Sequence, residues 1–434
     1  MNRKPVLTTI VIILLLSITT SIFLVSNKKV SLAISAPSYP SKIGFEDYDK
    51  EEERYEEINE SYIDSVKDFS IKSSSIVFKD SNRDKNDLYS PISLYMALAM
   101  VSETADGETR NQIVSALQSN DIDIIRSETG KLFRRLYYHN EIGKLTIGNS
   151  LWLNENVNFN NNLLQDMAKN YYAHSFSLDF KDDKSPEKIS KWVSENTGGK
   201  LGNDKSSFTL KPDDVMVLIN TIYLYDQWID EFKTDLTEED IFYLADGSTV
   251  NSDFMNMTHA SQSFVKGQSY TASGLSLKNL SQMIFILPDE GISPYDLVSD
   301  EEQFKNMFNN ISEDNRSMGE VVFKVPKFNF KSDLELNDLI KSLGIVDIFD
   351  RENANFAPLS DTKPLFISGV SQKANISIDE KGVEATAYTD IRYAGAAPPD
   401  GRAEMILNRP FIFILTGSGN IPLFVGIINN PSVN

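Results

Sequence analysis

The chain has 434 residues, 41% of them hydrophobic and 24% charged, and its 62 Asp and Glu outnumber its 42 Lys and Arg, which gives a formal net charge of −20. That length suffices for two or three ordinary domains or one large mixed domain, and a chain this acidic lacks the basic face that nucleic-acid binding needs. With no cysteine and only three histidines, it has no thiol nucleophile, disulfide or Cys-ligated zinc, and little material for a histidine-based metal site or catalytic triad.

Residues 1–35 have the layout of a targeting segment. Two basic residues precede an uncharged run rich in Ile and Leu, residues 5–26, and two lysines close it. Together with the small-residue site at Ala33-Ile34-Ser35, this is typical of a cleaved secretory signal. The run is also long enough to span a bilayer as a helix, so a cleaved signal and a retained anchor both stay open. In either case we expect an extracellular protein, secreted or tethered to the outer face of the cytoplasmic membrane, with no other membrane contact.

Residues 36–60 are predicted to be an acidic linker. The run FEDYDKEEERYEEINE contains nine acidic and two basic residues, too polar to bury enough apolar surface to fold alone. The charge favours a solvated spacer. In the alternative, Phe45, Tyr48, Tyr55 and Ile58 dock this strip onto the domain that follows.

Residues 61–434 are predicted to form one continuous globular domain. Tyr62, Val66 and Phe69 have helical spacing, and residues 90–117 continue as helix with a turn near their middle. The later runs LTIGNSLWLNE, VMVLINTIYLY, SQMIFILPDE and GEVVFKVPKFNF are rich in β-formers and bounded by turn residues. Helices dominate early and strands later without steady βαβ alternation, which indicates an α+β fold.

The common catalytic and metal-binding motifs are missing from this sequence. It contains no G-x-S-x-G, no G-x-x-x-x-G-K-[ST] and no H-E-x-x-H. Residues 80–86 imitate the start of a calcium loop, but Lys85 occupies the glycine position and Pro91 the position of the bidentate glutamate. We therefore expect neither an enzyme nor a metal site.

One stretch near the C-terminus has the pattern of a strand with a single buried face. Gly382 is followed by VEATAYTDIRY, residues 383–393, and then by glycine and proline. Its odd-numbered residues can all be buried, whereas the residues between them are mostly polar. The smallest side chains come directly after the glycine, as a strand entering a tight space would require. A plain surface hairpin is the alternative that periodicity alone would favour.

The run ISIDEKGVEATAYT resembles the hinge of the serpins, serine protease inhibitors that insert their reactive loop into a β-sheet. Further stretches resemble the family in the family's order, and together they cover Tyr62 to Pro431. No single stretch is diagnostic, but the ordered set is very specific. These stretches are NDLYSPISLYMALAM, ISKWVSENTGGKL, VMVLINTIYLYDQWIDEF, VPKFNFKSDLELNDLIKSLGI and NRPFIFILTGSGNIPLFVGIINNP.

The resemblance implies a serpin fold, with three β-sheets, about eight or nine helices and an exposed reactive loop. A target protease would cleave the loop and become trapped as an acyl-enzyme while the loop inserts as a central strand. Insertion of about eleven residues would add roughly ten backbone hydrogen bonds at about 1 kcal/mol each. The uninserted protein would then be kinetically trapped, because that gain rivals the stability of a whole domain.

The resemblance also assigns roles around the hinge. Glu380 and Lys327 match a salt bridge where the loop enters the sheet, and Gly382 matches the hinge glycine. Val383 stands where Thr or Ser is usual, but it suits a buried strand. In the residues that follow, the polar Glu384 would face solvent and two small side chains would face the sheet; these are Ala385 and Ala387.

A second group of residues matches the region where the sheet opens. Ser90, Ser93 and Asn220 match a polar cluster, and Trp228 matches a tryptophan near the point where the loop enters. The histidine usual in that cluster is Gln372 here. Because an amide keeps the hydrogen bonds but cannot be protonated, pH gating through this position is in doubt.

The reactive bond is placed at Ala396–Ala397, sixteen residues beyond Glu380. Counting back from the C-terminal motif points nearer Pro399, so this loop is about three residues longer on its far side than is usual. Small residues at the bond favour an elastase-like or subtilisin-like serine protease with a shallow pocket. Cysteine proteases stay open as targets, and cleavage after Arg392 or Arg402 by a trypsin-like enzyme is the less favoured alternative. We expect a monomer without cofactors, and in particular no heparin-type activator.

Two other functions are considered. A non-inhibitory serpin-fold protein, acting as a binding module or chaperone, would usually carry charged or bulky hinge residues, and here the inward positions are small or apolar. A hydrolase would require catalytic residues that the sequence does not offer.

Overall fold

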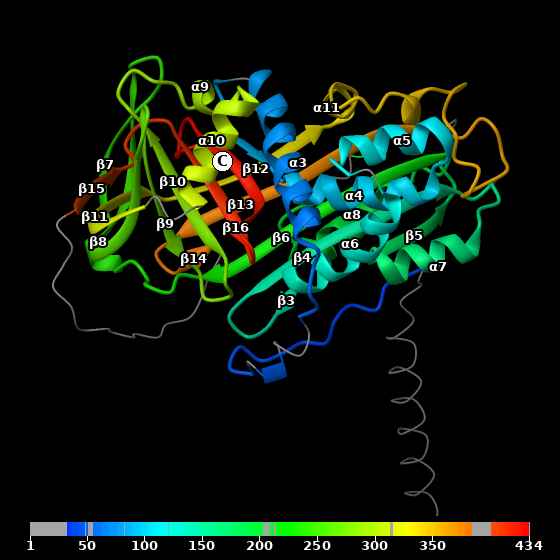
Figure 1. Cartoon of the computed structure of the whole chain (residues 1–434), viewed down its shortest axis with the longest axis horizontal. Coiled ribbons are helices and arrows are strands. Elements are labelled where there is room, and N and C mark those ends of the chain that lie inside the picture. Colours follow the sequence, from blue (N-terminus) through cyan, green and yellow to red (C-terminus); the bar gives the residue numbers. More distant parts are fainter. Residues whose placement is uncertain are drawn as a thin grey trace, which may run out of the picture.

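The structure is a computed structural model that describes residues 33–47, 49–50, 55–81, 83–119, 121–202, 208, 210–211, 214–312, 316–383 and 401–433. These residues form two hydrogen-bonded β-sheets with helices packed around them, which confirms the α+β class (Figure 1). None of the described helices is long and apolar enough to cross a membrane. The proposed targeting run, residues 5–26, lies outside the described part of the chain.

The first sheet carries the candidate site. It has eight strands, of which β6 and β13 extend along the long axis of the molecule in Figure 1. β4 and β6 pair antiparallel over ten residue pairs, from Lys144 opposite Tyr225 to Leu153 opposite Met216. β3 (Tyr138–His139) pairs with β4 outside the main order. That order is β1 (Ala33–Ser35), β5 (Ala173–Leu178), β4 (Lys144–Asn154), β6 (Met216–Gln227), β14 (Gly382–Val383), β13 (Ile367–Asp379) and β12 (Phe328–Glu335).

The second sheet has nine strands among the described residues. β8 (Thr249–Gly267) is 19 residues long and belongs to two parts of this sheet, because it pairs with β7 and β11 and then with β9. If this sheet is divided within β8, it gives two smaller sheets, which together with the first sheet make the three that the resemblance implies. The main order is β15 (Gly401–Ile406), β11 (Ser317–Pro326), β8, β9 (Tyr270–Ser276), β10 (Gln282–Pro288), β16 (Phe411–Gly417), β17 (Ile421–Ile428) and β2 (Asp87–Tyr89), with β7 (Glu238–Tyr243) beside β8.

Nine α-helices lie within the described residues. All 14 residues of α4 are buried, so its apolar residues are spread around the helix and are not confined to one face. α8 covers the opposite face of the first sheet, where Trp192 packs on Trp152. The helices are α3 (Glu60–Lys79), α4 (Pro91–Thr104), α5 (Gly107–Ala116), α6 (Ile122–Leu136), α7 (Asn161–Asn170), α8 (Ser185–Asn196), α9 (Pro294–Val298), α10 (Glu301–Ser312) and α11 (Asn337–Ser342).

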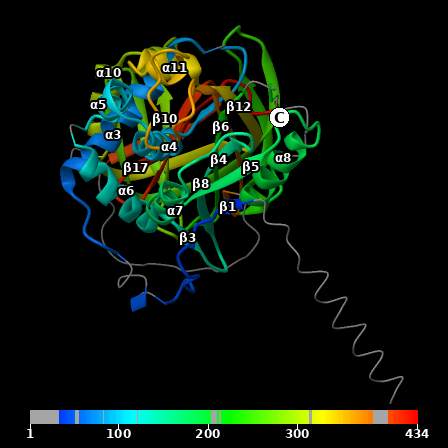
Figure 2. The same ribbon diagram turned by 90° about the vertical axis from the view of Figure 1, so that its right-hand side faces the viewer.

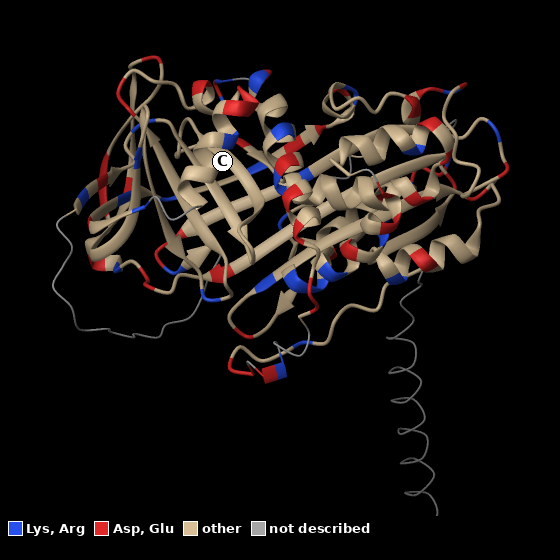
Figure 3. Cartoon of the chain, in the orientation of Figure 1, with Lys and Arg blue, Asp and Glu red and all other residues tan. Residues whose placement is uncertain are grey.

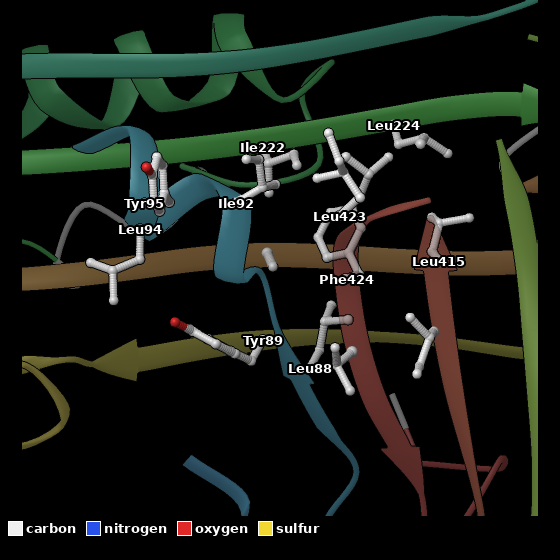
Figure 4. Close-up of a cluster of buried hydrophobic side chains, with 14 of the residues drawn as sticks. Leu88, Tyr89, Ile92, Leu94, Tyr95, Ile222, Leu224, Leu415, Leu423 and Phe424 are labelled. Carbon is white, nitrogen blue, oxygen red and sulfur yellow. The ribbon is translucent and has the colours of Figure 1, made fainter. Parts of the chain in front are cut away.

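The main core lies between the two sheets. Figure 4 shows Ile92 and Tyr95 of α4 together with Leu224 of β6 and Phe424 of β17. β16 and β17 are buried at every position, so their sequences are nearly continuous apolar runs without polar alternation. In the orthogonal view, helices surround these sheets (Figure 2). Along the ribbon in Figure 3, positions of Lys and Arg are interspersed with positions of Asp and Glu.

The N-terminal segment packs against the domain, which the solvated-spacer interpretation did not anticipate. β1 pairs with β5, and the ring of Tyr39 lies between 5.7 and 6.1 Å from four other rings, those of Phe133, Tyr137, Tyr172 and His174. Of the residues named in the docking alternative, Ile58 is buried, Phe45 and Tyr55 are half-buried, and Tyr48 lies outside the described residues.

Candidate functional site

The candidate site is a fork in the first sheet between β6 and β13. Toward one end the two strands are direct neighbours in parallel register, up to Thr221 opposite Lys373. Toward the other end β14 lies between them, with Val383 opposite both Asp226 of β6 and Ile378 of β13. The fork thus contains residues 222–225 of β6 and 374–377 of β13, which lie between the two sets of pairs.

The turn that leads into β14 is tight. The side chain of Asp379 accepts hydrogen bonds from the backbone N–H groups of Lys381, at 2.9 Å, and Gly382, at 3.3 Å. A Cβ on Gly382 would lie only 2.2 Å from the carbonyl oxygen of Asp226. Glycine is therefore required here by the close approach of two backbones, at the position that the resemblance assigns to the hinge glycine.

The predicted Glu380–Lys327 pair is present at this turn. The ammonium of Lys327 lies 3.0 Å from Glu380 Oε1, and the hydroxyl of Thr237 donates to the same oxygen at 2.9 Å. Burial alone would raise the pKa of Glu380, but the hydrogen bonds from its own backbone N–H, Lys327 and Thr237 outweigh it and lower that pKa. The carboxylate therefore stays ionised and holds the turn in place.

Trp228 donates two hydrogen bonds to the same turn. Its indole N–H donates to the carbonyl of Asp379 and its backbone N–H to that of Lys381, both at 2.9 Å. The side chain is fully buried and packs edge-on against Phe232 at 6.2 Å. Trp228 thus contacts the turn that leads into β14.

Val383 is buried, with only 2% of its surface exposed. Residues directly opposite one another in a sheet point to the same face, so Val383 lies on the inner face with Ile378 and Asp226, which are also buried. The remaining predicted loop residues lie outside the described part of the chain. They are Glu384, Ala385, Ala387, Ala396 and Ala397.

The four residues of the predicted polar cluster are only partly joined. Gln372 accepts from the backbone N–H of Ser90 and donates to its carbonyl, both at 2.8 Å, and the Ser90 hydroxyl donates to Leu423. Asn220 lies opposite Gln372 in the ladder but donates to Asn149, at 2.6 Å. Ser93 is buried, and its hydroxyl has no hydrogen-bond partner among the described residues.

Two residues that hydrogen-bond to the candidate site were not identified from the sequence. Asn149 is an amide in the middle of the β-rich run LTIGNSLWLNE, and its central position was the available signal. Thr237 carries no such signal, because its contact with Glu380 joins residues 143 positions apart.

Comparison with known proteins decides the family. The family model described as Serpin (serine protease inhibitor) matches residues 64–431. The chain belongs to the serpin family. Human Serpin B11 is 29% identical over 379 residues, 82% of this chain and 96% of the relative. An uncharacterized serpin-like protein of Methanosarcina acetivorans is 29% identical over 392 residues, 85% of this chain and 88% of its own.

A solved serpin structure supports the same assignment. The native state of the thermophilic serpin tengpin superposes with a TM-score of 0.77 at 30% sequence identity, covering 91% of this chain and 97% of that one. The family and fold implied by the resemblance are therefore confirmed. Serpins as a class are protease inhibitors rather than catalysts, and target proteases are their kind of partner.

Proposed function

We propose that this serpin is an inhibitor of an elastase-like or subtilisin-like serine protease. The protease would cleave Ala396–Ala397 and form an acyl-enzyme, and the released loop would insert between β6 and β13. The observation that carries the proposal is the position of Val383, which is already buried and paired with both strands. A charged or bulky residue at this place would oppose insertion, whereas valine suits the inner face of the sheet.

The register of β14 supports this proposal, because the same pairing can be extended along both strands. Extension of β14 by the same pairing brings Ala385 opposite Leu224 and Ile376, and two residues later Ala387 opposite Ile222 and Ala374. These four sheet residues are all buried on the inner face, so small apolar side chains suit the positions that meet them. Four residues, 384–387, would fill the fork.

Beyond residue 387 the strands themselves must separate. The next residue would have to part Thr221 from Lys373, and the one after it Asn220 from Gln372. Each residue that enters would replace one β6–β13 pair with two pairs, one to β6 and one to β13. The sheet would therefore gain hydrogen bonds as it opens. This gain would drive insertion to completion once cleavage frees the loop.

The proposed location is outside the cytoplasm, either secreted or tethered to the outer face of the membrane. Its support is the charge layout of the first 35 residues. Cleavage directly after Ser35 would remove β1 and its pairs with β5. N-terminal sequencing of the secreted protein tests this, since a start at Ala36 would mean that the mature domain lacks β1.

The inhibitory function is tested by mixing the soluble domain with elastase-like, subtilisin-like, trypsin-like and cysteine proteases. We expect a covalent complex that survives denaturing electrophoresis with the first two classes. Cleavage of the loop by every protease without any such complex would refute the inhibitory mechanism and favour a non-inhibitory binding protein.

A further inference from the structure

A pocket lies directly over the line along which β6 and β13 would have to separate. Its volume is about 280 Å³. Val217 and Ile219 of β6 line one side of it, and Gly369 and Ser371 of β13 line the other. Ile219 and Ser371 are direct partners in the closed ladder, and Ile219 belongs to the hydrophobic cluster that includes α8. The pocket is therefore on the outer face of the sheet, away from the inner face that carries the hinge.

The charged groups that line this pocket, among the described residues, are two carboxylates and one ammonium. Asp214, just before β6, is 7% exposed and accepts a hydrogen bond from the backbone N–H of Lys211 at 2.8 Å. Glu335 ends β12, opposite Ser371. Within the described part of the chain, neither carboxylate has an ion-pair partner, and the buried hydroxyl of Ser368 in the same pocket has no hydrogen-bond partner. Because buried polar groups are normally paired, this composition suits a cationic group that donates several hydrogen bonds.

The register of β14 predicts which loop residues would reach this pocket. Continued by the same pairing, the inserted strand brings residue 390 opposite Ile219 and Ser371, and residue 392 opposite Val217. All three of these sheet residues line the pocket. Successive side chains of a strand alternate between faces, so the even-numbered loop residues point to the outer face and the odd-numbered ones to the inner face. The two residues that meet the pocket are Asp390 and Arg392.

We propose that this outer-face pocket binds the guanidinium of Arg392 when the loop inserts and thereby fixes the far part of the inserted strand. The inference rests on the proposed inhibitory function. Separation of β6 from β13 widens the pocket by one strand spacing, about 4.8 Å, and the backbone of the incoming strand fills that width beneath it. Asp214 would then lie on the β6 side of Arg392, and Glu335 on the β13 side. Arginine suits two carboxylates because its planar fork donates hydrogen bonds in pairs.

The neighbouring loop residue is also complementary in charge. Lys373 of β13 is 7% exposed, pairs with Asp333 and has its ammonium 5.1 Å from the ring of Phe208, which belongs to the cluster on the outer face. It would lie diagonally across from Asp390, a separation that a long side chain can bridge. In the direction of the inserted chain an acid precedes a base, and on the sheet Lys373 precedes the two carboxylates of the pocket. The sheet therefore matches the order of charges on its own loop.

In this role Arg392 positions the inserted strand and is not a recognition residue for the protease. The test measures how a labelled, amidated peptide of residues 383–393 binds to the uncleaved protein. The parent peptide should enter the sheet, and the Arg392→Ala peptide should dissociate at least about 10-fold faster, the loss expected for a charged hydrogen-bonding group. The Thr386→Ala peptide is the matched control, because residue 386 would lie on the same face but within the fork, and it should dissociate like the parent.

An exchange of charge between peptide and protein tests the pocket itself. Glu335→Lys should weaken binding of the parent peptide and strengthen binding of the Arg392→Glu peptide, each several-fold. Asp338→Lys is the control with the same change of charge, because Asp338 is exposed and does not line the pocket. It should leave the preference between the two peptides unchanged. A merely structural role of Glu335 would weaken both peptides alike.

The outcomes separate this inference from the proposed function. If the parent peptide does not enter the sheet, loop insertion itself is wrong. If it enters and the Arg392→Ala peptide dissociates at the parent rate, or if Glu335→Lys leaves the preference between the peptides unchanged, insertion stands and the role of the pocket is refuted. Glu335→Gln should also weaken the parent peptide more than the Arg392→Ala peptide, so the pocket remains testable if Glu335→Lys does not fold.

Discussion

Val383→Glu should convert the inhibitor into a substrate. Val383 is 2% exposed and lies on the inner face opposite Asp226, so insertion of a glutamate there buries a second carboxylate beside the first. An uncompensated buried charge costs about 3–5 kcal/mol, and loss of the buried valine adds about 1.5–3 kcal/mol. In the uncleaved variant this cost should keep residue 383 out of the sheet, so that it must be met when the loop inserts. If about 4 kcal/mol of it falls on the insertion barrier, insertion slows roughly 1000-fold. The acyl-enzyme would then hydrolyse before the protease is displaced.

Val383→Arg should be the milder change, although arginine is the larger side chain. Opposite side chains in a sheet have Cβ atoms about 5 Å apart, so the guanidinium would come within reach of the Asp226 carboxylate and be partly compensated. The structure therefore predicts that glutamate slows insertion more than arginine does, an order that side-chain size or hydrophobicity alone would not predict.

The assay is the number of inhibitor molecules consumed per protease molecule inhibited, at pH 7.5, together with the yield of covalent complex. Cleavage of the loop should proceed at an unchanged rate in both variants. Glu384→Arg is the matched control, because alternation places residue 384 on the opposite face, and it should inhibit like the parent. If Val383→Glu inhibits with the parent's stoichiometry, the hinge does not need to enter the sheet.

Three further predictions concern the loop and the turn that precedes it. Cleavage of the loop between residues 393 and 399 should raise the melting temperature by tens of degrees, since the uninserted form is the less stable one; calorimetry that finds no change would exclude insertion. Mass spectrometry of the fragment released by an elastase-like protease should show a new N-terminus at Ala397, and a first cut consistently after an arginine would instead indicate a trypsin-like target. Glu380→Gln should cost no more than about 1 kcal/mol, because Lys327 is one-third exposed. Since the pKa of Glu380 is lowered, its contribution is present above its ordinary pKa and lost as the pH falls through its folded pKa, so the melting temperatures of variant and parent should converge in acid.

Several elements could be predicted from the sequence because their own residues determine them. LTIGNSLWLNE and VMVLINTIYLY correspond to β4 and β6, and the helical spacing after Tyr62 corresponds to α3. GEVVFKVPKFNF was predicted as one strand-rich run, but the structure divides it between β11 and β12, which lie in different sheets. Pro326 ends β11 at the division, because it has no N–H to continue a ladder.

Other features depend on residues that are distant in the chain. The docking of the N-terminal segment depends on rings from positions 133, 137, 172 and 174 around Tyr39, and nothing near Tyr39 in the sequence signals it. Asp226 looks like an ordinary polar end to a strand, but Tyr138, Asn279 and the neighbouring β14 bury it. The hinge itself was predictable because it is one continuous segment with a familiar order of residues.

The two hydrogen-bond ladders of β6 also determine between which strands the first sheet can open. On one side β6 is joined to β4 by ten consecutive antiparallel pairs. On the other it is joined to β13 by five parallel pairs with an irregularity between Ile367 and Val370, and parallel pairs are slightly the weaker kind. A force that pulls the sheet apart would therefore separate β6 from β13 before it separates β6 from β4, whatever the sequence of the incoming strand. Changes in the loop can alter the rate of insertion, but the sheet alone determines which two strands separate.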